Sequence, residues 1–388
     1  MFCNSKFYLS IFLLLIISCQ SIDEFETSIS PNNITEIEDN LYLLSLNGSS
    51  RATAYPNLNK IDNIGELFFI SWLGIDKNIF KPNITYFNIK NKKFGKTFII
   101  DKSFDNHGVP SILVDKKNRI NMFYYPHSHH IKHAIGTFSN DSILSWDLKK
   151  SLGNYLTYPN PVYQKDSGIL LFSRKTVNIP GPNPLVTYGF HTINKDNSSY
   201  RGLFRTNFSG YGAFSSFILS DNNKLSIASN FHENSFNDTY GNYQTISYVE
   251  SFDGGFSWKK NALEDIKYKY IPSLRWKNLM LDNLITSSKS SIVYLGGIKK
   301  GNYLNIGGLQ NNKFGEPQIL FLKESIEESK IFIADRNHLN KSWGLKEISK
   351  KIFSFFKKKR FSGPMGGYYL NNDLEIFPLI IQDDIILR

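Results

Sequence analysis

Five of the eight histidines fall within one short stretch of the chain, which continues to a tyrosine and an arginine. The residues are His107, His127, His129, His130, His133, Tyr158 and Arg174. A neutral imidazole or a phenol can take or give a proton, and a guanidinium can bind a carboxylate through two hydrogen bonds. Such a set suits removal of the weakly acidic C5 proton of a uronic acid, with the arginine neutralising the charge that builds up on the carboxyl group.

Two hairpins are predicted to position these side chains. Residues 111–115 and 120–125 are rich in β-formers and flank a polar loop, which predicts an antiparallel hairpin centred on Lys117. If the pairing extends that far, it sets His107 opposite His127; the alternative is that the outer part splays, because Pro110 cannot donate to a ladder. Facing Cβ atoms in such a ladder lie about 5 Å apart.

The second hairpin is predicted in the same way, by counting residues outward from the centre of its loop. Residues 161–163 and 169–173 flank a loop around Asp166, which sets Tyr158 opposite Arg174. If the two hairpins are neighbouring repeats, their open ends share one face and the four polar side chains converge. A slip of one residue in register turns a side chain to the other face of the sheet.

Other roles for these residues remain open at this point. A histidine at a strand end is commonly a structural hydrogen-bonding group, and a tyrosine beside an arginine is commonly packing. His129, His130 and His133 are candidate metal ligands, although a loop of solvent-facing histidines is the interpretation that we favour. Hydrolysis of glycosides needs two positioned carboxylates or, in sialidases, a tyrosine nucleophile. Asp105 and Asp115 form no convincing acidic pair, which weakens a hydrolase interpretation.

Short predicted strands separated by Asn, Asp, Gly and Lys fill the chain beyond residue 50. Units of several strands recur at intervals of about 40 to 50 residues, which is typical of a β-propeller. We expect an all-β fold, a seven-bladed β-propeller that occupies residues 51–388. The segment SFDGGFSW, from Ser251 to Trp258, matches the Asp-box pattern S-x-D-x-G-x-[ST]-W, which predicts a tight hairpin turn with the tryptophan packed beneath it.

The N-terminus has the pattern of an export signal. Residues 1–19 combine a lysine, a short apolar run and Ser18 before Cys19, like a bacterial lipobox, which predicts cleavage and lipidation of Cys19. A plain signal peptide with an incidental cysteine is the alternative. Residues 20–50 have few large apolar side chains, so we expect a flexible tether. The protein is then exported and anchored by lipid in the bacterial envelope, facing the periplasm or at the outer membrane surface.

The charge of the chain indicates an anionic partner. The formal net charge is +11 at pH 7. For an exported protein, an acidic polysaccharide or an envelope surface fits this charge better than a nucleic acid does, and we expect a monomer that contacts the membrane through its N-terminal lipid. Cys3 leaves with the signal, so no internal disulfide is expected.

Three segments resemble a known family: DNHGVPSILVDKKNRINMFYYPHS, TYPNPVYQKDSGILLFSR and YGAFSSFILSDNNKLSIASNFHENS. They are similar to BNR-4 type seven-bladed propellers that include ulvan lyases of polysaccharide lyase families 24 and 25. The resemblance implies cleavage of ulvan, a sulfated algal polysaccharide, by β-elimination that leaves a 4,5-unsaturated uronate end. Carried over by position, His107 and Tyr158 are the base and the acid in either order, His127 is a partner in the same site, and Arg174 neutralises the uronate.

Further expectations concern the surroundings of this site. Tyr211 and His232 lie near the ends of the following hairpin, so both are candidate substrate contacts. The resemblance implies a structural metal ion, zinc or calcium, with no ligands assigned, and no organic cofactor. The stretch 175–205 diverges from the family, which favours as the alternative function a non-catalytic propeller that captures sulfated glycans.

Overall fold

The computed structural model consists of β-strands joined by turns, and no helix occurs among the residues that it describes. These residues are 28–30, 34–38, 41–45, 48–49, 58–77, 79–103, 105, 107–124, 129–139, 142–164, 168–177, 185–193, 198–204, 215–221, 224–233, 243–269, 303–324, 329–347, 360–361, 369–370, 375–376 and 381–382. Within these ranges no helix is long and apolar enough to cross a membrane. The predicted all-β class is confirmed.

The first sheet has the order β1-β8-β6-β5-β4, and β7 pairs with β6. Its strands are β1 (Ser28–Ser30), β4 (Ile61–Ile64), β5 (Leu67–Asp76), β6 (Ile79–Asn88), β7 (Lys93–Phe94) and β8 (Thr97–Ile99). A separate hairpin joins β2 (Thr35–Glu38) to β3 (Leu41–Leu43). Strands β1 to β3 lie within the range predicted to be a tether, and β1 is attached to the first sheet through β8.

The second sheet has seven strands in the order β15-β14-β13-β12-β11-β10-β9. They are β9 (Ser111–Val114), β10 (Arg119–Tyr124), β11 (His129–Ser139), β12 (Ser142–Gln164), β13 (Gly168–Val177), β14 (Leu185–Ile193) and β15 (Ser198–Phe204). The long strand β12 pairs with β11 through its first part and with β13 through its last part. It therefore ends one repeat of the fold and begins the next.

Both predicted hairpin centres are confirmed in this sheet. Val114 pairs with Ile120, which places the centre of the β9–β10 hairpin at Lys117. Gln164 pairs with Gly168, which places the centre of the β12–β13 hairpin at Asp166.

Two four-stranded sheets follow, with the orders β16-β17-β18-β19 and β20-β21-β22-β23. Their strands are β16 (Ser215–Asp221), β17 (Lys224–Glu233), β18 (Tyr243–Ser251), β19 (Lys259–Lys269), β20 (Tyr303–Asn311), β21 (Pro317–Glu324), β22 (Ser329–Arg336) and β23 (Trp343–Glu347). Near the C-terminus, β24 (Arg360–Phe361) pairs with β27 (Ile381–Gln382), and β25 (Tyr369–Leu370) pairs with β26 (Glu375–Ile376).

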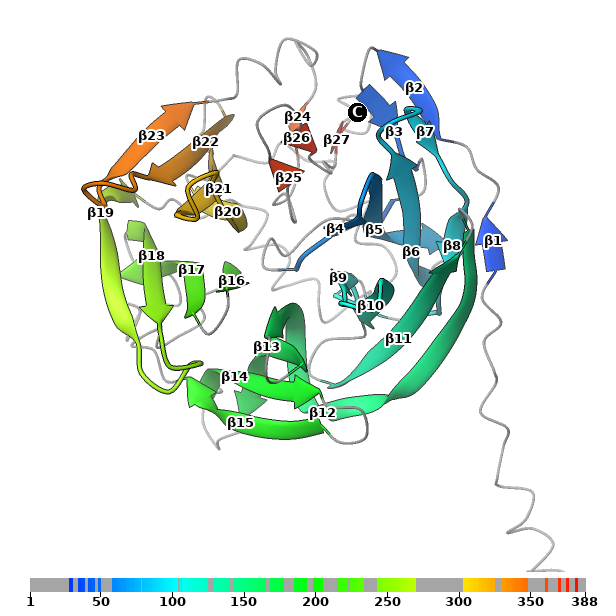
Figure 1. Cartoon of the computed structure of the whole chain (residues 1–388), viewed down its shortest axis with the longest axis horizontal. Coiled ribbons are helices and arrows are strands. Elements are labelled where there is room, and N and C mark those ends of the chain that lie inside the picture. Colours follow the sequence, from blue (N-terminus) through cyan, green and yellow to red (C-terminus); the bar gives the residue numbers. More distant parts are fainter. Residues whose placement is uncertain are drawn as a thin grey trace, which may run out of the picture.

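The sheets stand around a common centre, which makes the fold a β-propeller (Figure 1). Strands β4, β9, β16 and β20 lie toward this centre, while β15, β19 and β23 lie at the rim. Strand β12 contacts both β9 and β16. The described residues form four sheets of four or more strands, so the count of seven blades stays a prediction.

The core lies between neighbouring sheets. One buried cluster joins Phe69 of the first sheet to Ile120 of the second, and another joins Phe172 of the second sheet to Leu225 of the third. Each such side chain contributes about 1.5–3 kcal/mol when it is removed from water. Because these two clusters, and a third that joins Tyr248 to Phe321, each take residues from two sheets, burial holds neighbouring sheets together.

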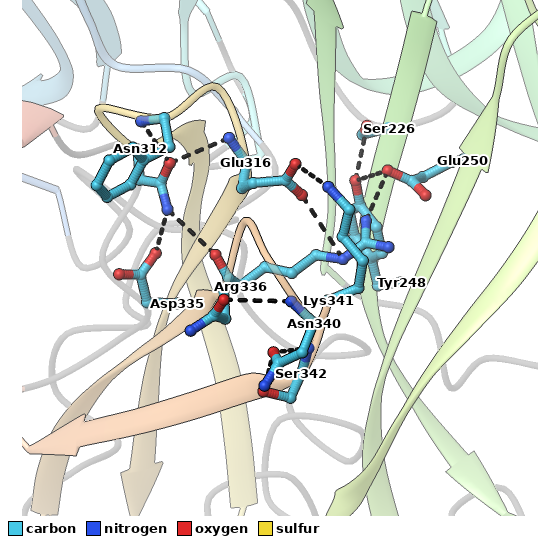
Figure 2. Close-up of polar contacts among 12 residues, drawn as sticks. Ser226, Tyr248, Glu250, Asn312, Glu316, Asp335, Arg336, Asn340, Lys341 and Ser342 are labelled. Atoms are coloured by element: carbon cyan, nitrogen blue, oxygen red, sulfur yellow. Dashed lines mark hydrogen bonds and ion pairs between the residues drawn. The ribbon is translucent and has the colours of Figure 1, made fainter.

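An ion-pair network fastens the third sheet to the fourth (Figure 2). Glu250 of β18 is buried, and its Oε1 accepts hydrogen bonds from the Nζ of Lys224 at 2.7 Å, the Nη1 of Arg336 at 2.9 Å and the hydroxyl of Tyr248 at 2.9 Å. Burial raises the pKa of Glu250, but the hydrogen bonds from Lys224 and Tyr248 and the charges of Lys224 and Arg336 outweigh burial and lower it overall. The carboxylate is therefore ionised at neutral pH.

The Asp-box turn between β18 and β19 has the predicted structure. Asp253 Oδ1 accepts the backbone N–H of Ser257 at 2.9 Å, and its Oδ2 accepts the Ser257 hydroxyl at 2.5 Å. These bonds hold the pKa of Asp253 well below its usual range. Gly254 and Gly255 have φ of +73° and +98°, which favours glycine at both positions. Trp258 packs against the buried cluster beneath the turn, so the motif is structural.

Candidate active site

His107 lies in a turn that leads into β9, outside the strand ladder. The ladder between β9 and β10 ends with the pair Ser111 and Phe123, directly after Pro110, which has no N–H to donate. The described pairing therefore ends before His107, as expected if the outer part splays at Pro110. His127, its expected partner, lies outside the described residues.

The turn that carries His107 is anchored on the first sheet. Ser103 pairs with Phe80 of β6 through two backbone hydrogen bonds of 2.7 and 2.9 Å. The Ser103 hydroxyl lies 3.3 Å from the backbone N–H of Asp105, which donates to it. Gly108 donates its N–H to the carbonyl of Asp105 at 3.2 Å, and a Cβ at this glycine would lie only 2.8 Å from Ser103 Oγ. The backbone around His107 is therefore closely packed.

A carboxylate holds the imidazole of His107. Asp105 Oδ1 accepts the backbone N–H of His107 at 2.9 Å and lies 2.5 Å from the ring Nδ1. The side chains are 24% exposed for His107 and 28% exposed for Asp105, so solvent or a ligand can still reach the pair. Sequence reasoning considered Asp105 only as a possible member of an acidic pair. The spacing D-x-H in the sequence could have indicated this contact, because an aspartate side chain commonly accepts a hydrogen bond from the backbone N–H two residues further on.

Tyr158 lies in a β-bulge, which corrects its predicted register. The ladder pairs Arg174 with Thr157 and not with Tyr158, because Tyr158 and Pro159 together occupy the place of one residue on β12. Tyr158 has a φ of +58°. The left-handed region costs a non-glycine residue roughly 1–2 kcal/mol, and such strain tends to cluster at functional sites.

The side chain of Tyr158 packs beside the His107 turn. Only 5% of the residue is exposed, and its ring belongs to a buried cluster with Leu58, Phe80 and Val109. Val109 follows His107 by two residues, and Phe80 is the strand residue on which that turn is anchored. The structure thus brings Tyr158 and the His107 turn to the same place. The packing also holds the tyrosine ring in one position.

The remaining predicted site residues are only partly described. The backbone of Arg174 lies in β13 and that of His232 in β17, where His232 pairs with Gln244. Their side chains, and all of Tyr211 and Cys19, lie outside the described part of the structure. Their proposed roles stay predictions.

His133 corrects the expectation of a solvent-facing histidine loop. It lies in β11 with only 3% exposed, its Nε2 is 3.0 Å from Asn121 Oδ1, and its ring stacks on Phe123 at a centroid distance of 4.4 Å. His130 in the same strand is exposed. Among the described residues, no group of three or more His, Cys, Asp or Glu side chains is placed to hold a metal ion. The structural zinc or calcium ion stays a prediction with no ligands assigned.

Lys60 is a buried ionisable residue that sequence reasoning missed. It has no exposed surface, and its Nζ donates a hydrogen bond to the carbonyl of Leu58 at 3.0 Å. Burial lowers the pKa of Lys60 well below its usual value. The side chain of Leu58 packs in the cluster that contains Tyr158.

The candidate site and the Asp-box turn lie on opposite faces of the propeller. The Nζ of Lys116, in the β9–β10 turn, lies 4.7 Å from the ring centroid of Tyr163, and a Cβ at Gly254 would lie 3.2 Å from the side chain of Gln164. These contacts place the hairpin turns of neighbouring repeats on one face. Tyr158 lies about 20 Å before Gln164 along β12, at 3.3 Å per residue. It is therefore near the face opposite to the one that carries these turns.

The sequence profile of BNR repeat-containing proteins matches residues 69–351, which is more than half of the chain. The chain belongs to this BNR_4 family. The Asp-box turn and the ring of sheets of this family member agree with that assignment. A search of curated proteins finds no significant match.

Several solved structures are similar to this family member at low identity. A polysaccharide lyase family 25 ulvan lyase bound to -[GlcA(1-4)Rha3S]- is 12% identical with a TM-score of 0.48, over 86% of this chain and 82% of that one. The NanB sialidase from Streptococcus pneumoniae is 10% identical with a TM-score of 0.44, over 78% and 62%. An exo-1,5-α-L-arabinanase from a bovine ruminal metagenomic library is 10% identical with a TM-score of 0.40, over 76% and 98%. Likenesses of this degree carry no information on activity.

Proposed function

We propose that this propeller is a polysaccharide lyase that cleaves ulvan by β-elimination. The observation that carries the proposal is the meeting of the His107 turn and the Tyr158 bulge beside one buried cluster. The segments that carry a carboxylate-held imidazole and a strained, closely packed tyrosine thus lie beside the same cluster, which supports a shared role of the two side chains in proton transfer. A β-elimination needs one group to remove a proton and another to supply one.

The proposed reaction breaks the bond between C4 of a uronic acid and the glycosidic oxygen. A base takes the C5 proton, the electron pair forms the C4–C5 double bond, and the leaving oxygen receives a proton from an acid. Negative charge builds up on the uronate carboxyl group as the C5 proton leaves. Arg174 is proposed to neutralise this charge, since its backbone pairs with Thr157, directly before the Tyr158 bulge.

Roles for three further residues are proposed from their positions in the sequence. His127 is proposed as a partner in the same site, and Tyr211 and His232 as contacts to the bound chain. The net charge of +11 suits a substrate that carries sulfate and carboxylate groups. Export and anchoring through Cys19 would place the enzyme where a polysaccharide can reach it.

A direct assay is incubation of the purified protein with ulvan while the ultraviolet absorbance of the new double bond is followed. We expect absorbance to rise with the wild type and to stay flat with His107→Ala and with Tyr158→Phe. Circular dichroism and thermal unfolding show whether each variant keeps its fold. A folded variant that reacts at the wild-type rate would remove that residue from the mechanism.

A non-catalytic glycan-binding propeller is the second candidate, favoured by the net charge and by the divergent stretch 175–205. It predicts salt-sensitive binding of ulvan with no product. A hydrolase would release reducing ends without ultraviolet absorbance. The same incubation therefore separates the three functions.

A further inference from the structure

We propose that Asp105 is a positioning residue that fixes the tautomer of His107 and makes its Nε2 the proton acceptor of the reaction. This inference rests on the proposed lyase function and deepens it, because the sequence left open whether His107 or Tyr158 is the base. It assigns proton removal to His107 and proton donation to Tyr158.

The tautomer follows from the hydrogen bonds of Asp105. An ionised carboxylate can only accept hydrogen bonds, and Asp105 Oδ1 lies 2.5 Å from Nδ1 of His107. Nδ1 must therefore carry a hydrogen. A neutral imidazole carries one ring N–H, so Nε2 is left with a lone pair, which is the form that a general base needs.

The carboxylate is held in place before any substrate binds. The same Oδ1 accepts the backbone N–H of His107 at 2.9 Å, so the side chain closes a small turn on its own backbone. The backbone of Asp105 is bonded in both directions to the Ser103 hydroxyl, at 3.3 and 3.2 Å, and Ser103 has no exposed surface. Asp105 has little freedom to leave the imidazole.

The arrangement also favours the charge that the reaction creates. When Nε2 takes the C5 proton, the ring becomes an imidazolium whose second N–H already points at a carboxylate, which stabilises the cation. The electron pair of the broken C–H bond forms the C4–C5 double bond, and the bond from C4 to the glycosidic oxygen breaks. The Tyr158 hydroxyl gives its proton to that oxygen. Exchange with water then returns a proton to the tyrosine and removes one from His107.

Asp115 provides a matched control. Its Oδ1 accepts the backbone N–H of Lys117 at 2.9 Å, two residues further on, in the same pattern as Asp105 with His107. Its remaining bonds go to Arg119 and to no histidine. Asp115→Asn therefore disturbs a similar turn in the next hairpin without touching an imidazole.

The first test reads the tautomer without any turnover. Nitrogen NMR of the protein labelled with ¹⁵N-histidine, from Gln20 to the C-terminus, reports which ring nitrogen carries the hydrogen, and His107→Gln identifies the signal. All described contacts lie beyond residue 27, so the missing leader leaves them intact. We expect a protonated Nδ1 for His107 in the wild type and in Asp115→Asn, and a mixture of both tautomers in Asp105→Asn. A protonated Nε2 in the wild type, or no change in Asp105→Asn, would overturn the proposal.

The second test measures kinetics on ulvan. Asp105→Asn keeps an oxygen for the backbone N–H but loses the charge, so kcat should fall roughly 10- to 100-fold, the range expected for a charge-assisted hydrogen bond, with KM little changed. The acid limb of the kcat/KM profile should move to lower pH, because the imidazolium is no longer stabilised. Asp115→Asn should keep the wild-type kcat and profile.

The two tests separate the two proposals. A wild type that forms no unsaturated product refutes the lyase function, and NMR still decides whether Asp105 fixes the tautomer. A working lyase whose Asp105→Asn variant keeps the wild-type kcat and pH profile refutes the role of Asp105 alone.

Discussion

Replacing Lys60 with methionine should stabilise the protein at neutral pH by an amount that shrinks as the pH rises. Lys60 is fully buried, and the one hydrogen bond described for its Nζ goes to the carbonyl of Leu58. Burial lowers the pKa of Lys60 well below its usual value, so above that lowered pKa the folded protein holds the amine in its neutral form while the unfolded chain still binds a proton. Methionine is a flexible, unbranched apolar side chain that adapts to irregular core space and has no amine to desolvate.

The magnitude follows from counting protons. Between the lowered pKa of folded Lys60 and the unfolded value of about 10.4, the unfolded chain binds one proton more than the folded chain. The free energy of unfolding of the wild type therefore rises with pH by about 1.4 kcal/mol per unit within this window, and the rise ends above the unfolded pKa. The methionine variant lacks this dependence. Its advantage over the wild type should shrink by about 2.7 kcal/mol over two pH units.

Equilibrium urea unfolding at about pH 7.5, 8.5 and 9.5, followed by tryptophan fluorescence, measures this difference. Lys90→Met is the matched control, since Lys90 is an exposed lysine in the turn after β6 of the same first sheet. Its stability relative to the wild type should not change over this pH range. If the gap between Lys60→Met and the wild type were constant with pH, folded Lys60 would keep its proton, and the reasoning from burial would be refuted.

Three further predictions concern the ion pairs and the turn that hold the sheets of the propeller together. Glu250→Gln removes the charge that pairs with Lys224 and Arg336, and Arg336 keeps only Glu316 at 3.8 Å, so the variant should cost up to about 3 kcal/mol in unfolding experiments, whereas Lys341→Met, at a half-exposed pair, should cost less than about 1 kcal/mol. Because the folded pKa of Glu250 is lowered, its contribution should be complete above the unfolded pKa of about 4.3 and should disappear as the pH falls through the folded pKa, which a pH series of melting temperatures can follow. Asp253→Ala should lower the melting temperature but leave kcat and KM on ulvan unchanged, because the Asp-box lies on the face opposite the candidate site; a large loss of kcat in a folded variant would contradict that placement.

The parts of the fold that depend on local chemistry could be predicted from the sequence. Both hairpin centres, at Lys117 and Asp166, follow from polar loops between runs of β-formers. The Asp-box around Asp253 is also local, because its hydrogen bonds join residues no more than four positions apart.

The parts that depend on backbone strain or on distant neighbours could not be predicted. The bulge at Tyr158 requires a left-handed backbone at a tyrosine, and no residue pattern predicts this. The bulge shifts the partner of Arg174 by one residue, from Tyr158 to Thr157. The burial of His133 and of Lys60 results from sheets that pack against them in the folded ring. The spacing of Asp105 from His107 could have predicted the bond to the His107 backbone. The contact with the imidazole ring depends on side-chain positions that the sequence does not give.

The central claim is that the propeller cuts ulvan by elimination, and the structure of the new chain ends tests it most directly. Mass spectrometry of the oligosaccharides released by the wild type should show a non-reducing uronate that is one water lighter than a hydrolysis product, with ultraviolet absorbance rising in step, and neither signal should arise with His107→Ala. Ends that have gained water, or binding of ulvan with no new ends at all, would contradict the account.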